Sequence, residues 1–550
     1  MSTETHGLPT EQEQSATTYA GLLRSVAAAR PDAVALAFPG RRLTYRELVD
    51  RGAARAKELR ALGVGRGDRF GMLLPNCPEL VELLIGGAMI GAAAVPINTR
   101  FKSVELEHVC VDGALKALFT TDAVDDHVDF KALLWEALPG LKEAPDPQRL
   151  ALPRAPELGA VALVSEREAP GLLAAHALRD LAAGQPEVTP DDAPDGDDPL
   201  LIMYTSGTTA KPKGCLQTNV AVVTNTGNIA ERFAIPAGDR WWDPLPMFHM
   251  GAILLMTAVF HRGGTFISQG HFDADEAFDL IEEHRPTVLY PLFPTITLSL
   301  LHHPRFAQAT LEQVRVITNV SPPDIQRQIQ DALPGATLIS AYGMTELCGT
   351  LAYSRLDDTL EQRTTTCGHL LPGWEAKIID PETGATVAPD VRGELVVRGD
   401  CLFAGYFNDP GQTAASIDAD GYFHTGDHCS LDADGLLLFH GRLKDVLKVG
   451  GENVSALEVE SFLATQPGVK LAQVVGVPDD KYDEVAAAFI ELAPGARLTE
   501  REVKDFCNGR IARFKIPRYV RFVTEWPMSS TKVQKFRLRD TLMAELGRDA

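Results

Sequence analysis

Short apolar runs alternate with helical patterns over the first part of the chain, and this alternation constrains the fold more than any other feature. The run 33–38 is followed by a helical pattern in which Thr44 and Glu47 have the spacing of a capping box. The run 69–74 is followed by a helix that begins at Pro78. Short strands that alternate with helices are typical of a layered α/β fold.

The pattern starts again after Lys444 on a smaller scale. Its expected elements are a helix at 456–464, strands at 473–477, 485–492 and 518–523, and a helix capped by Thr499 and Glu502. A segment of this length is sufficient for a small α+β domain. We therefore predict an α/β chain of two domains, a large multi-layer N-terminal domain over 1–443 and a small mobile α+β domain over 444–550.

Two further segments carry structural expectations. Residues 145–198 are rich in Pro, Ala, Gly and Asp, which predicts a surface excursion with solvated acidic loops. The longest uncharged apolar stretch, 83–97, is shorter than the roughly 20 residues that span a bilayer. It predicts a buried helix that runs into a strand.

Composition restricts the class of protein. The 52 Lys and Arg against 74 Asp and Glu give a net charge of −22, which argues against nonspecific binding of nucleic acid. The 8 Cys are scattered without a Cys-x-x-Cys pair, as in reduced, intracellular proteins. We expect a cytoplasmic protein with no nucleic-acid partner and no integral membrane association, and a homodimer is left open.

A loop of hydroxyl groups, glycines and lysines, 204–214, follows the strand pattern at 199–204. Accessible backbone N–H groups, hydroxyl donors and ammonium groups are the parts that hold a polyphosphate. The spacing is not that of a Walker A loop, and a polar turn with solvated lysines is the alternative from composition alone. The candidate phosphate-binding residues are Thr205, Ser206, Gly207, Thr208, Thr209 and Lys213.

This loop closely resembles the phosphate-loop signature of the AMP-forming adenylating superfamily, which includes acyl-CoA synthetases, nonribosomal-peptide adenylation domains and beetle luciferases. The superfamily's later signatures follow in the same order, and the resemblance extends from about residue 20 to about residue 540. The matching segments are 242–250, 341–346, 422–427, 441–453 and 527–535.

The segment 341–346 resembles the superfamily's Tyr-Gly-x-Thr-Glu motif. The resemblance implies that Tyr342 stacks on adenine beside Gly343, that Thr345 contacts phosphate and that Glu346 holds Mg²⁺. A single carboxylate together with substrate phosphates is a usual way to bind Mg²⁺.

Two later motifs supply the ribose and hinge residues of the superfamily. The resemblance implies that Asp427 and Arg442 bind the ribose hydroxyls and that Lys444 is the pivot between domains. It also implies that Gly450 and Gly451 line the pantetheine tunnel. Taken alone, the Gly-Asp pair before residue 428 would be a turn between strands.

The superfamily's catalytic lysine and histidine also have matches. Lys532 matches the lysine that bridges the carboxylate and the α-phosphate, where an ammonium stabilises developing charge. The surrounding loop is one residue shorter than usual and has Thr531 in place of glycine, so Lys535 stays an alternative. His249 matches a histidine near the incoming carboxylate, and a core or loop histidine is the other interpretation.

Two other segments depart from the superfamily pattern. Ala210 stands where the phosphate loop usually has glycine. On the adenine side, the segment 318–323 has bulkier and more polar residues than the usual small ones, which leaves the shape of that pocket open. The match places Asn319 and Ser321 in this segment.

The resemblance implies an ATP-dependent acid:CoA ligase that uses ATP, Mg²⁺ and CoA. The carboxylate would be a medium-chain, aromatic or cyclic acid, because Ala341 precedes Tyr342 where dicarboxylate-type relatives tend to have arginine. Two alternatives stay open. One is a stand-alone adenylation enzyme that loads a carrier protein, and the other is a degenerate nucleotide-binding regulator.

Overall fold

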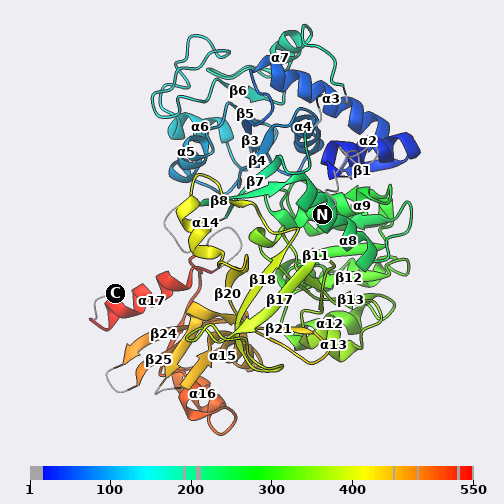
Figure 1. Cartoon of the computed structure of the whole chain (residues 1–550). Coiled ribbons are helices and arrows are strands. Elements are labelled where there is room, and N and C mark those ends of the chain that lie inside the picture. Colours follow the sequence, from blue (N-terminus) through cyan, green and yellow to red (C-terminus); the bar gives the residue numbers. More distant parts are fainter. Residues whose placement is uncertain are drawn as a thin grey trace, which may run out of the picture. The chain divides into compact units, whose positions relative to one another are not determined.

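The computed structural model describes residues 17–189, 192, 194–205, 212–449, 452–479, 482–528 and 533–547. The chain forms two compact units (Figure 1). Unit 1 contains Met1–Trp374 and Gly399–Ala415, and unit 2 contains Glu375–Arg398 and Ser416–Ala550. The predicted domains, 1–443 and 444–550, divide the chain at a different point. The second of them is defined as a mobile segment, and this division stays a prediction.

The first sheet of unit 1 has seven strands in the order β19-β8-β7-β4-β3-β5-β6. Its central strands are parallel, whereas β8 runs antiparallel to both β7 and β19. The strands are β19 (Gly405–Tyr406), β8 (Lys213–Thr218), β7 (Pro199–Thr205), β4 (Ala93–Pro96), β3 (Arg69–Leu73), β5 (Ala117–Thr120) and β6 (Ala160–Leu163).

Helices next to these strands share a buried core with them, in which residues of α5 and α6 pack on β4, β5 and β6. The helices of this region are α2 (Tyr19–Ala29), α3 (Tyr45–Ala61), α4 (Pro78–Met89), α5 (Ser103–Asp112), α6 (Phe130–Ala137) and α7 (Ala175–Ala182). The expected buried helix and strand at 83–97 are confirmed as α4 and β4, and the Thr44–Glu47 capping box is formed.

The second sheet of unit 1 has the order β13-β12-β11-β9-β10-β1-β2 and is parallel except for the β1–β2 pair. Its strands are β1 (Val34–Phe38), β2 (Arg41–Thr44), β9 (Arg240–Trp242), β10 (Thr265–Ile267), β11 (Val288–Leu292), β12 (Val316–Asn319) and β13 (Thr337–Ile339). Helices α10, α11 and α12 share a buried core with this sheet.

Unit 1 also contains further helices and a small third sheet. The helices are α8 (Asn219–Arg232), α9 (Met250–Phe260), α10 (Ala274–His284), α11 (Pro294–Leu301), α12 (Pro323–Ala332), α13 (Leu360–Thr365) and α14 (Pro410–Ser416). The short elements are η2 (Phe306–Gln308), η3 (Thr345–Leu347) and the sheet of β14 (Ala341–Tyr342), β15 (Ala352–Tyr353) and β16 (His369–Leu370).

Unit 2 contains a four-stranded and a five-stranded sheet. The first has β17 (Trp374–Ile379), β18 (Gly393–Gly399), β20 (Phe423–Leu431) and β21 (Leu437–Arg442). The second has β22 (Val446–Val449), β23 (Glu452–Ser455), β24 (Val469–Asp479), β25 (Asp483–Leu492) and β26 (Tyr519–Phe522). The other elements are α15 (Ala456–Ala464), α16 (Glu500–Cys507), α17 (Lys535–Glu545), η4 (Leu443–Asp445) and η5 (Arg513–Lys515).

The five-stranded sheet has a core on each face. Residues of α15 and α16 pack on one core, and residues of α17 pack on the other. The expected α+β pattern after Lys444 is thus confirmed in its elements, including the Thr499–Glu502 capping box.

The expectation of a surface excursion at 145–198 is wrong in part. The segment contributes β6, whose four residues are all buried at the edge of a parallel sheet. Its acidic end is also not merely solvated, because Arg66 contacts Asp195 and lies 2.6 Å from Asp198. A four-residue apolar run among Pro and Gly is a weak sequence signal for a strand. Ion pairs with arginines that are distant in the sequence leave no local sequence pattern.

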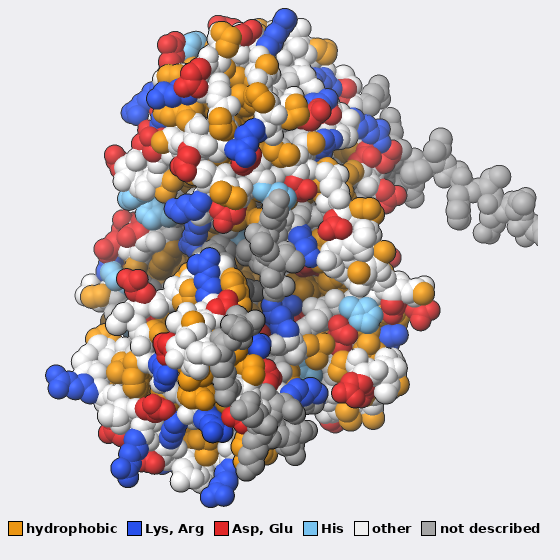
Figure 2. Space-filling view, turned by 90° about the vertical axis from the view of Figure 1, so that its left-hand side faces the viewer, with side chains coloured by type: hydrophobic (Ala, Val, Ile, Leu, Met, Phe, Trp, Pro, Cys, Tyr) orange, Lys and Arg blue, Asp and Glu red, His pale blue; other side chains and the backbone are white. Residues whose placement is uncertain are grey.

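Two observations concern the surface. Among the residues that the structure describes, no helix is both long and apolar enough to cross a membrane. Figure 2 shows acidic and basic side chains interspersed over the face that it displays.

Helices α3 and α4 cross so closely that Gly86 has no room for a side chain. A Cβ at Gly86 would lie 2.8 Å from the backbone nitrogen of Ala56 and 2.9 Å from the carbonyl oxygen of Gly52. We predict that Gly86→Val lowers the free energy of unfolding by about 1–3 kcal/mol, measured by urea unfolding. Gly184→Val is the control, since a Cβ there has no neighbour within 4 Å. Equal effects of the two substitutions would contradict the prediction.

Candidate active site

The candidate phosphate loop is anchored by the antiparallel pair β7–β8. Thr205 at the end of β7 pairs with Lys213 at the start of β8, so both ends of the loop are fixed to the sheet. Lys213 donates from Nζ to Oε1 of Gln412 at 2.8 Å and lies 5.5 Å above the ring of Tyr406. The rest of the loop, which includes Ser206, Gly207, Thr208 and Thr209, lies outside the described residues.

The same sheet edge contacts the segment that carries Thr345 and Glu346. The buried Gln217 of β8 donates from Nε2 to the carbonyl oxygen of Thr345 at 2.7 Å. Tyr406 of β19 donates from Oη to Oε1 of Glu346 at 2.9 Å. Unit 1 therefore brings Thr205, Lys213, Thr345 and Glu346 to one edge of the sheet.

The tyrosine and glycine of the same motif are placed by β14. Tyr342 is buried and pairs with Ala352 of β15. A Cβ at Gly343 would lie 2.0 Å from the carbonyl oxygen of Gly349, so no larger residue fits there. The pairing of β14 with β15 and the close packing at Gly343 thus fix the backbone before Thr345.

Asn319 is the last residue of β12 and Ser321 lies two positions further on, and both belong to the atypical segment 318–323. Asn319 is fully buried and donates from Nδ2 to Oγ1 of Thr297 at 2.7 Å. Its Oδ1 and the Oγ of Ser321 are buried without a hydrogen-bond partner among the described residues. Buried polar atoms in native proteins are usually paired, so these two atoms are suited to a ligand or water.

His249 lies at the N-cap of α9, at the end of a loop that Asn76 holds. Nδ2 of Asn76 donates to the carbonyl oxygen of Leu245 at 2.8 Å, and its Oδ1 accepts from the backbone nitrogen of Met247 at 2.7 Å. The ring centroids of Phe248 and His249 are 4.7 Å apart. The half-buried His249 is therefore set by a fixed loop.

The other end of α9 is fixed to α8 by His261. Its Nε2 lies 3.0 Å from Oγ1 of Thr226 and 3.1 Å from the carbonyl oxygen of Val223. Burial lowers the pKa of His261 to about 4. The imidazole is therefore neutral in the folded protein at neutral pH.

Unit 2 brings together the two residues matched to ribose binding. Asp427 and Arg442 are paired in register on β20 and β21, and Nε of Arg442 lies 2.8 Å from Oδ1 of Asp427. Asp427 is buried, and Arg442 also donates to the carbonyl oxygen of Thr425 at 3.2 Å. Gly426, which precedes Asp427 in β20, has a φ of +67°, which favours glycine.

Charged groups of unit 2 cluster around Lys444. Burial lowers the pKa of Lys444, assisted by Arg442 and opposed by Asp445. Lys535 places Nζ 2.6 Å from Oε1 of the buried Glu460 and 3.7 Å from Oδ2 of Asp445. Gly450, Gly451 and Lys532 lie outside the described residues.

The residues present fit a Mg²⁺ ion that is held mainly by phosphate. No group of three or more His, Cys, Asp or Glu side chains in the described part of the chain could hold a metal by itself. Glu346 is a half-buried carboxylate at the sheet edge that carries Lys213 and Thr205. One carboxylate with substrate phosphates is the ligand set that Mg²⁺ often has.

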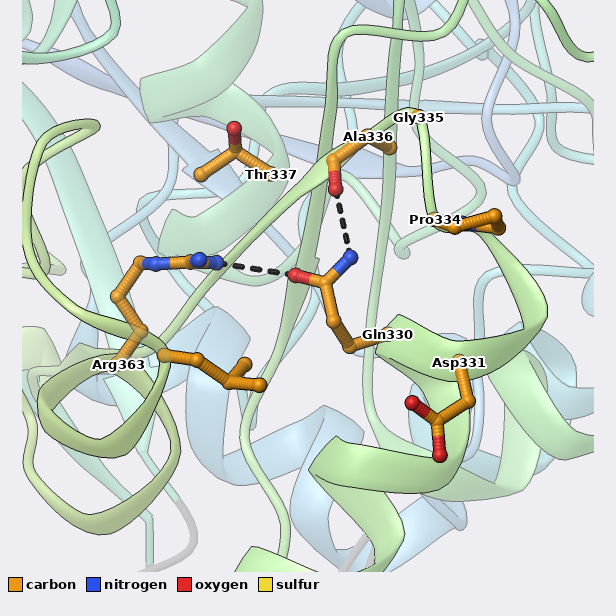
Figure 3. Close-up of a pocket in the computed structure, with 8 residues that line it drawn as sticks. Gln330, Asp331, Pro334, Gly335, Ala336, Thr337 and Arg363 are labelled. Atoms are coloured by element: carbon orange, nitrogen blue, oxygen red, sulfur yellow. Dashed lines mark hydrogen bonds between the residues drawn. The ribbon is translucent and has the colours of Figure 1, made fainter.

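A separate polar hollow of about 380 Å³ lies at the far edge of the second sheet (Figure 3). Its polar groups bind one another, since Gln330 donates to the carbonyl oxygen of Ala336 at 2.7 Å and accepts from Arg363 at 3.0 Å. None of the candidate residues lines it. We assign it no role.

The sequence analysis missed Asn76, Gln217 and Tyr406. Asn76 stands between a buried strand and a helix that begins with Pro78, which marks a turn but not its partner 169 residues away. Gln217 and Tyr406 look like ordinary strand residues in the sequence. Their contacts depend on strand pairing that a single sequence does not reveal.

Comparison with known proteins identifies the family of the chain. Residues 23–407 match the AMP-binding enzyme family, and residues 458–532 match the AMP-binding enzyme C-terminal domain. The medium-chain acyl-CoA ligase ACSF2 of Rattus norvegicus is 32% identical over 541 residues, covering 94% of this chain and 87% of that protein.

Solved structures of similar fold include two ligand complexes. The ATP-bound structure of MatB from Rhodopseudomonas palustris has a TM-score of 0.81 and 28% identity, and covers 95% of this chain and 98% of its own. The anthranilate CoA ligase AuaEII in complex with anthranoyl-AMP has a TM-score of 0.82 and 26% identity, and covers 96% of this chain and 98% of its own.

The chain belongs to the AMP-binding enzyme family, within the AMP-forming adenylating superfamily. It is an ATP-dependent acid:CoA ligase that uses ATP and CoA, as the motifs predicted. The α/β fold with a large N-terminal and a small C-terminal part is likewise confirmed.

We predict that His261 makes the protein less stable in acid. The unfolded chain takes up a proton at an ordinary histidine pKa of about 6.5, whereas the folded chain does so near 4. Stability therefore falls as the pH decreases from 6.5 to 4, on the order of 2 kcal/mol by pH 5. Urea unfolding at pH 7.5 and pH 5 measures this loss, and His261→Gln should reduce it.

The control for this experiment is His302→Gln, at an exposed position of the same unit. It should leave the acid loss unchanged. A loss that is equal in the wild type and in the His261→Gln variant would show that another group is responsible.

Proposed function

We propose that this ligase activates a medium-chain, aromatic or cyclic carboxylic acid. The observation that carries the proposal is Ala341 before the buried Tyr342, because no cation stands there to bind a second carboxylate. The names of two similar proteins, a medium-chain acyl-CoA ligase and an anthranilate CoA ligase, support the same range of acids.

In the first step, a carboxylate oxygen of the acid attacks the α-phosphorus of ATP. A new P–O bond forms, the bond to the bridging oxygen of the β-phosphate breaks, and pyrophosphate leaves, so that acyl-AMP remains. Lys532 is the proposed source of positive charge on the α-phosphate. Lys213 and Thr205, together with Ser206, Gly207, Thr208 and Thr209, are the proposed phosphate-binding residues.

The other proposed roles in this step follow the resemblance of the motifs to those of the superfamily. Tyr342 and Gly343 lie along the adenine, with Asn319 and Ser321 offering buried polar atoms on the same nucleotide. Asp427 and Arg442 bind the ribose hydroxyls, and His249 faces the carboxylate. Glu346 and Thr345 hold the phosphate end, where bound Mg²⁺ would neutralise phosphate charge.

In the second step, the thiolate of CoA attacks the acyl carbon. The C–S bond forms, the C–O bond to AMP breaks, and AMP leaves with the oxygen that came from the acid. We propose that residues 444–550 turn about Lys444 between the steps and that Gly450 and Gly451 line the pantetheine path. Two positions of one mobile domain would let the enzyme exclude water in one step and admit a thiol in the next.

The choice of Lys532 over Lys535 rests on the ion pairs of Lys535. Its ammonium group lies 2.6 Å from the carboxylate of Glu460, which is buried in unit 2. Separating a lysine from a buried carboxylate costs free energy, because the buried charge then has no partner. Lys535 is therefore suited to a structural role.

We propose a cytoplasmic enzyme, since the eight cysteines are scattered without a Cys-x-x-Cys pair, as in reduced, intracellular proteins. A homodimer stays a prediction. Transfer of the acyl group to a carrier protein is the second candidate function, and a regulator that binds nucleotide without turnover is the third.

We predict pyrophosphate release from Mg·ATP with apolar, aromatic or cyclic acids, increased by CoA with formation of acyl-CoA. Lys532→Ala should lower the rate roughly 100- to 1000-fold, because it removes charge from the transition state. Lys535→Arg should stay within about threefold of the wild type, because arginine keeps the ion pairs. The rates are measured by a coupled pyrophosphate assay.

Each other outcome indicates an alternative. Pyrophosphate release that does not depend on CoA would indicate a carrier protein as acceptor. ATP binding without pyrophosphate release, with any of the acids, would indicate the regulator. Loss of activity in Lys535→Arg with retention in Lys532→Ala would show that Lys535 is the catalytic lysine.

A further inference from the structure

We propose that Tyr406 is a positioning residue that fixes the carboxylate of Glu346 for a divalent cation on ATP. The inference rests on the proposed role of Glu346 as the metal-binding carboxylate. It adds a residue from a distant part of the chain, 60 positions away from Glu346.

Tyr406 and its neighbours contact Glu346 at two points. Oη of Tyr406 donates to Oε1 of Glu346 at 2.9 Å, and the backbone nitrogen of Phe403 donates to the carbonyl oxygen of Glu346 at 3.0 Å. The segment 403–406 therefore restrains both the backbone and the side chain of this glutamate.

The position of Tyr406 is itself fixed by strand pairing. On β19, Tyr406 is paired in register with Cys215 and Gly405 with Leu216. The pairing continues after the strand, because the backbone nitrogen of Phe407 donates to the carbonyl oxygen of Gly214 at 2.7 Å. A hydroxyl on a paired strand is held more rigidly than one on a free loop.

Neighbouring side chains restrain the ring and backbone of Tyr406. Its backbone nitrogen donates to Oγ1 of Thr413 at 2.9 Å, and the ring of Phe403 meets its ring edge-on at a centroid distance of 4.9 Å. Nζ of Lys213 lies over the ring at 5.5 Å. Tyr406 thus joins a candidate phosphate-binding lysine to the candidate metal-binding carboxylate.

A hydroxyl suits this role better than a charged partner. A carboxylate has about four acceptor positions, and one neutral hydrogen bond leaves others for a cation. Partners that hydrogen-bond to metal ligands orient them, and their loss typically weakens metal binding about 10- to 100-fold. An arginine or lysine in place of Tyr406 would instead oppose the bound cation.

The test measures Mn²⁺ binding to the full chain in the presence of a non-hydrolysable ATP analogue, followed by electron paramagnetic resonance. Tyr406→Phe removes the hydroxyl and keeps the ring beneath Lys213. We expect it to weaken Mn²⁺ binding roughly 10-fold, with analogue affinity at saturating Mn²⁺ nearly unchanged.

The matched control is Tyr45→Phe, which removes a hydroxyl of α3 that donates to the carbonyl oxygen of Gly264, directly before β10 of the same unit, at 2.7 Å. It should leave Mn²⁺ binding unchanged even if the protein becomes less stable. Glu346→Gln should weaken Mn²⁺ binding more than Tyr406→Phe does.

Three results would overturn the inference. If Glu346→Gln weakens Mn²⁺ binding and Tyr406→Phe does not, the positioning role is wrong and the proposed role of Glu346 stands. If Glu346→Gln has no effect, the proposed metal role fails and the inference fails with it. If Tyr45→Phe weakens binding as much as Tyr406→Phe, the effect reflects general destabilisation.

Discussion

The antiparallel pairing of β8, with β7 on one side and β19 on the other, is the interaction on which the candidate site of unit 1 depends. The β7 side closes the phosphate loop by joining Thr205 to Lys213. The β19 side carries Tyr406 to Glu346, and β8 itself reaches Thr345 through Gln217. Two signature motifs and the segment of Tyr406, far apart in the sequence, are thus connected to one strand.

The parallel strands behind β8 give this edge a rigid support. Parallel sheets are normally covered on both faces. In this sheet, residues of α5 and α6 pack on β4, β5 and β6 in a buried apolar core. The buried amide of Asn76, which follows β3 of this sheet, fixes the loop that leads to His249 after β9 of the other sheet. Residues that follow strands of both sheets therefore determine the position of His249.

The sequence was sufficient for the fold class, because local rules govern it. Alternating apolar runs predicted strands such as β1, β3 and β7, and capping boxes predicted the N-terminal ends of α3 and α16. The motif matches predicted pairs such as Asp427 and Arg442, which the structure places in register. Such features depend on neighbours in the sequence or on a whole motif.

Long-range partners could not be predicted in the same way. The contact from Tyr406 to Glu346 and the ion pair from Lys535 to Glu460 arise from strand order and helix packing. The buried strand β6 was missed because a four-residue run has too few positions for periodicity to show. Burial that comes from tertiary packing leaves little trace in local composition.

The transfer of oxygen from the acid to AMP tests the central chemical claim most directly. The substrate carboxylate is labelled with ¹⁸O, and the products of a reaction with Mg·ATP and CoA are analysed by mass spectrometry. If the carboxylate attacks the α-phosphorus, AMP carries one ¹⁸O atom and pyrophosphate carries none. Unlabelled AMP, or formation of ADP with labelled inorganic phosphate, would contradict the account.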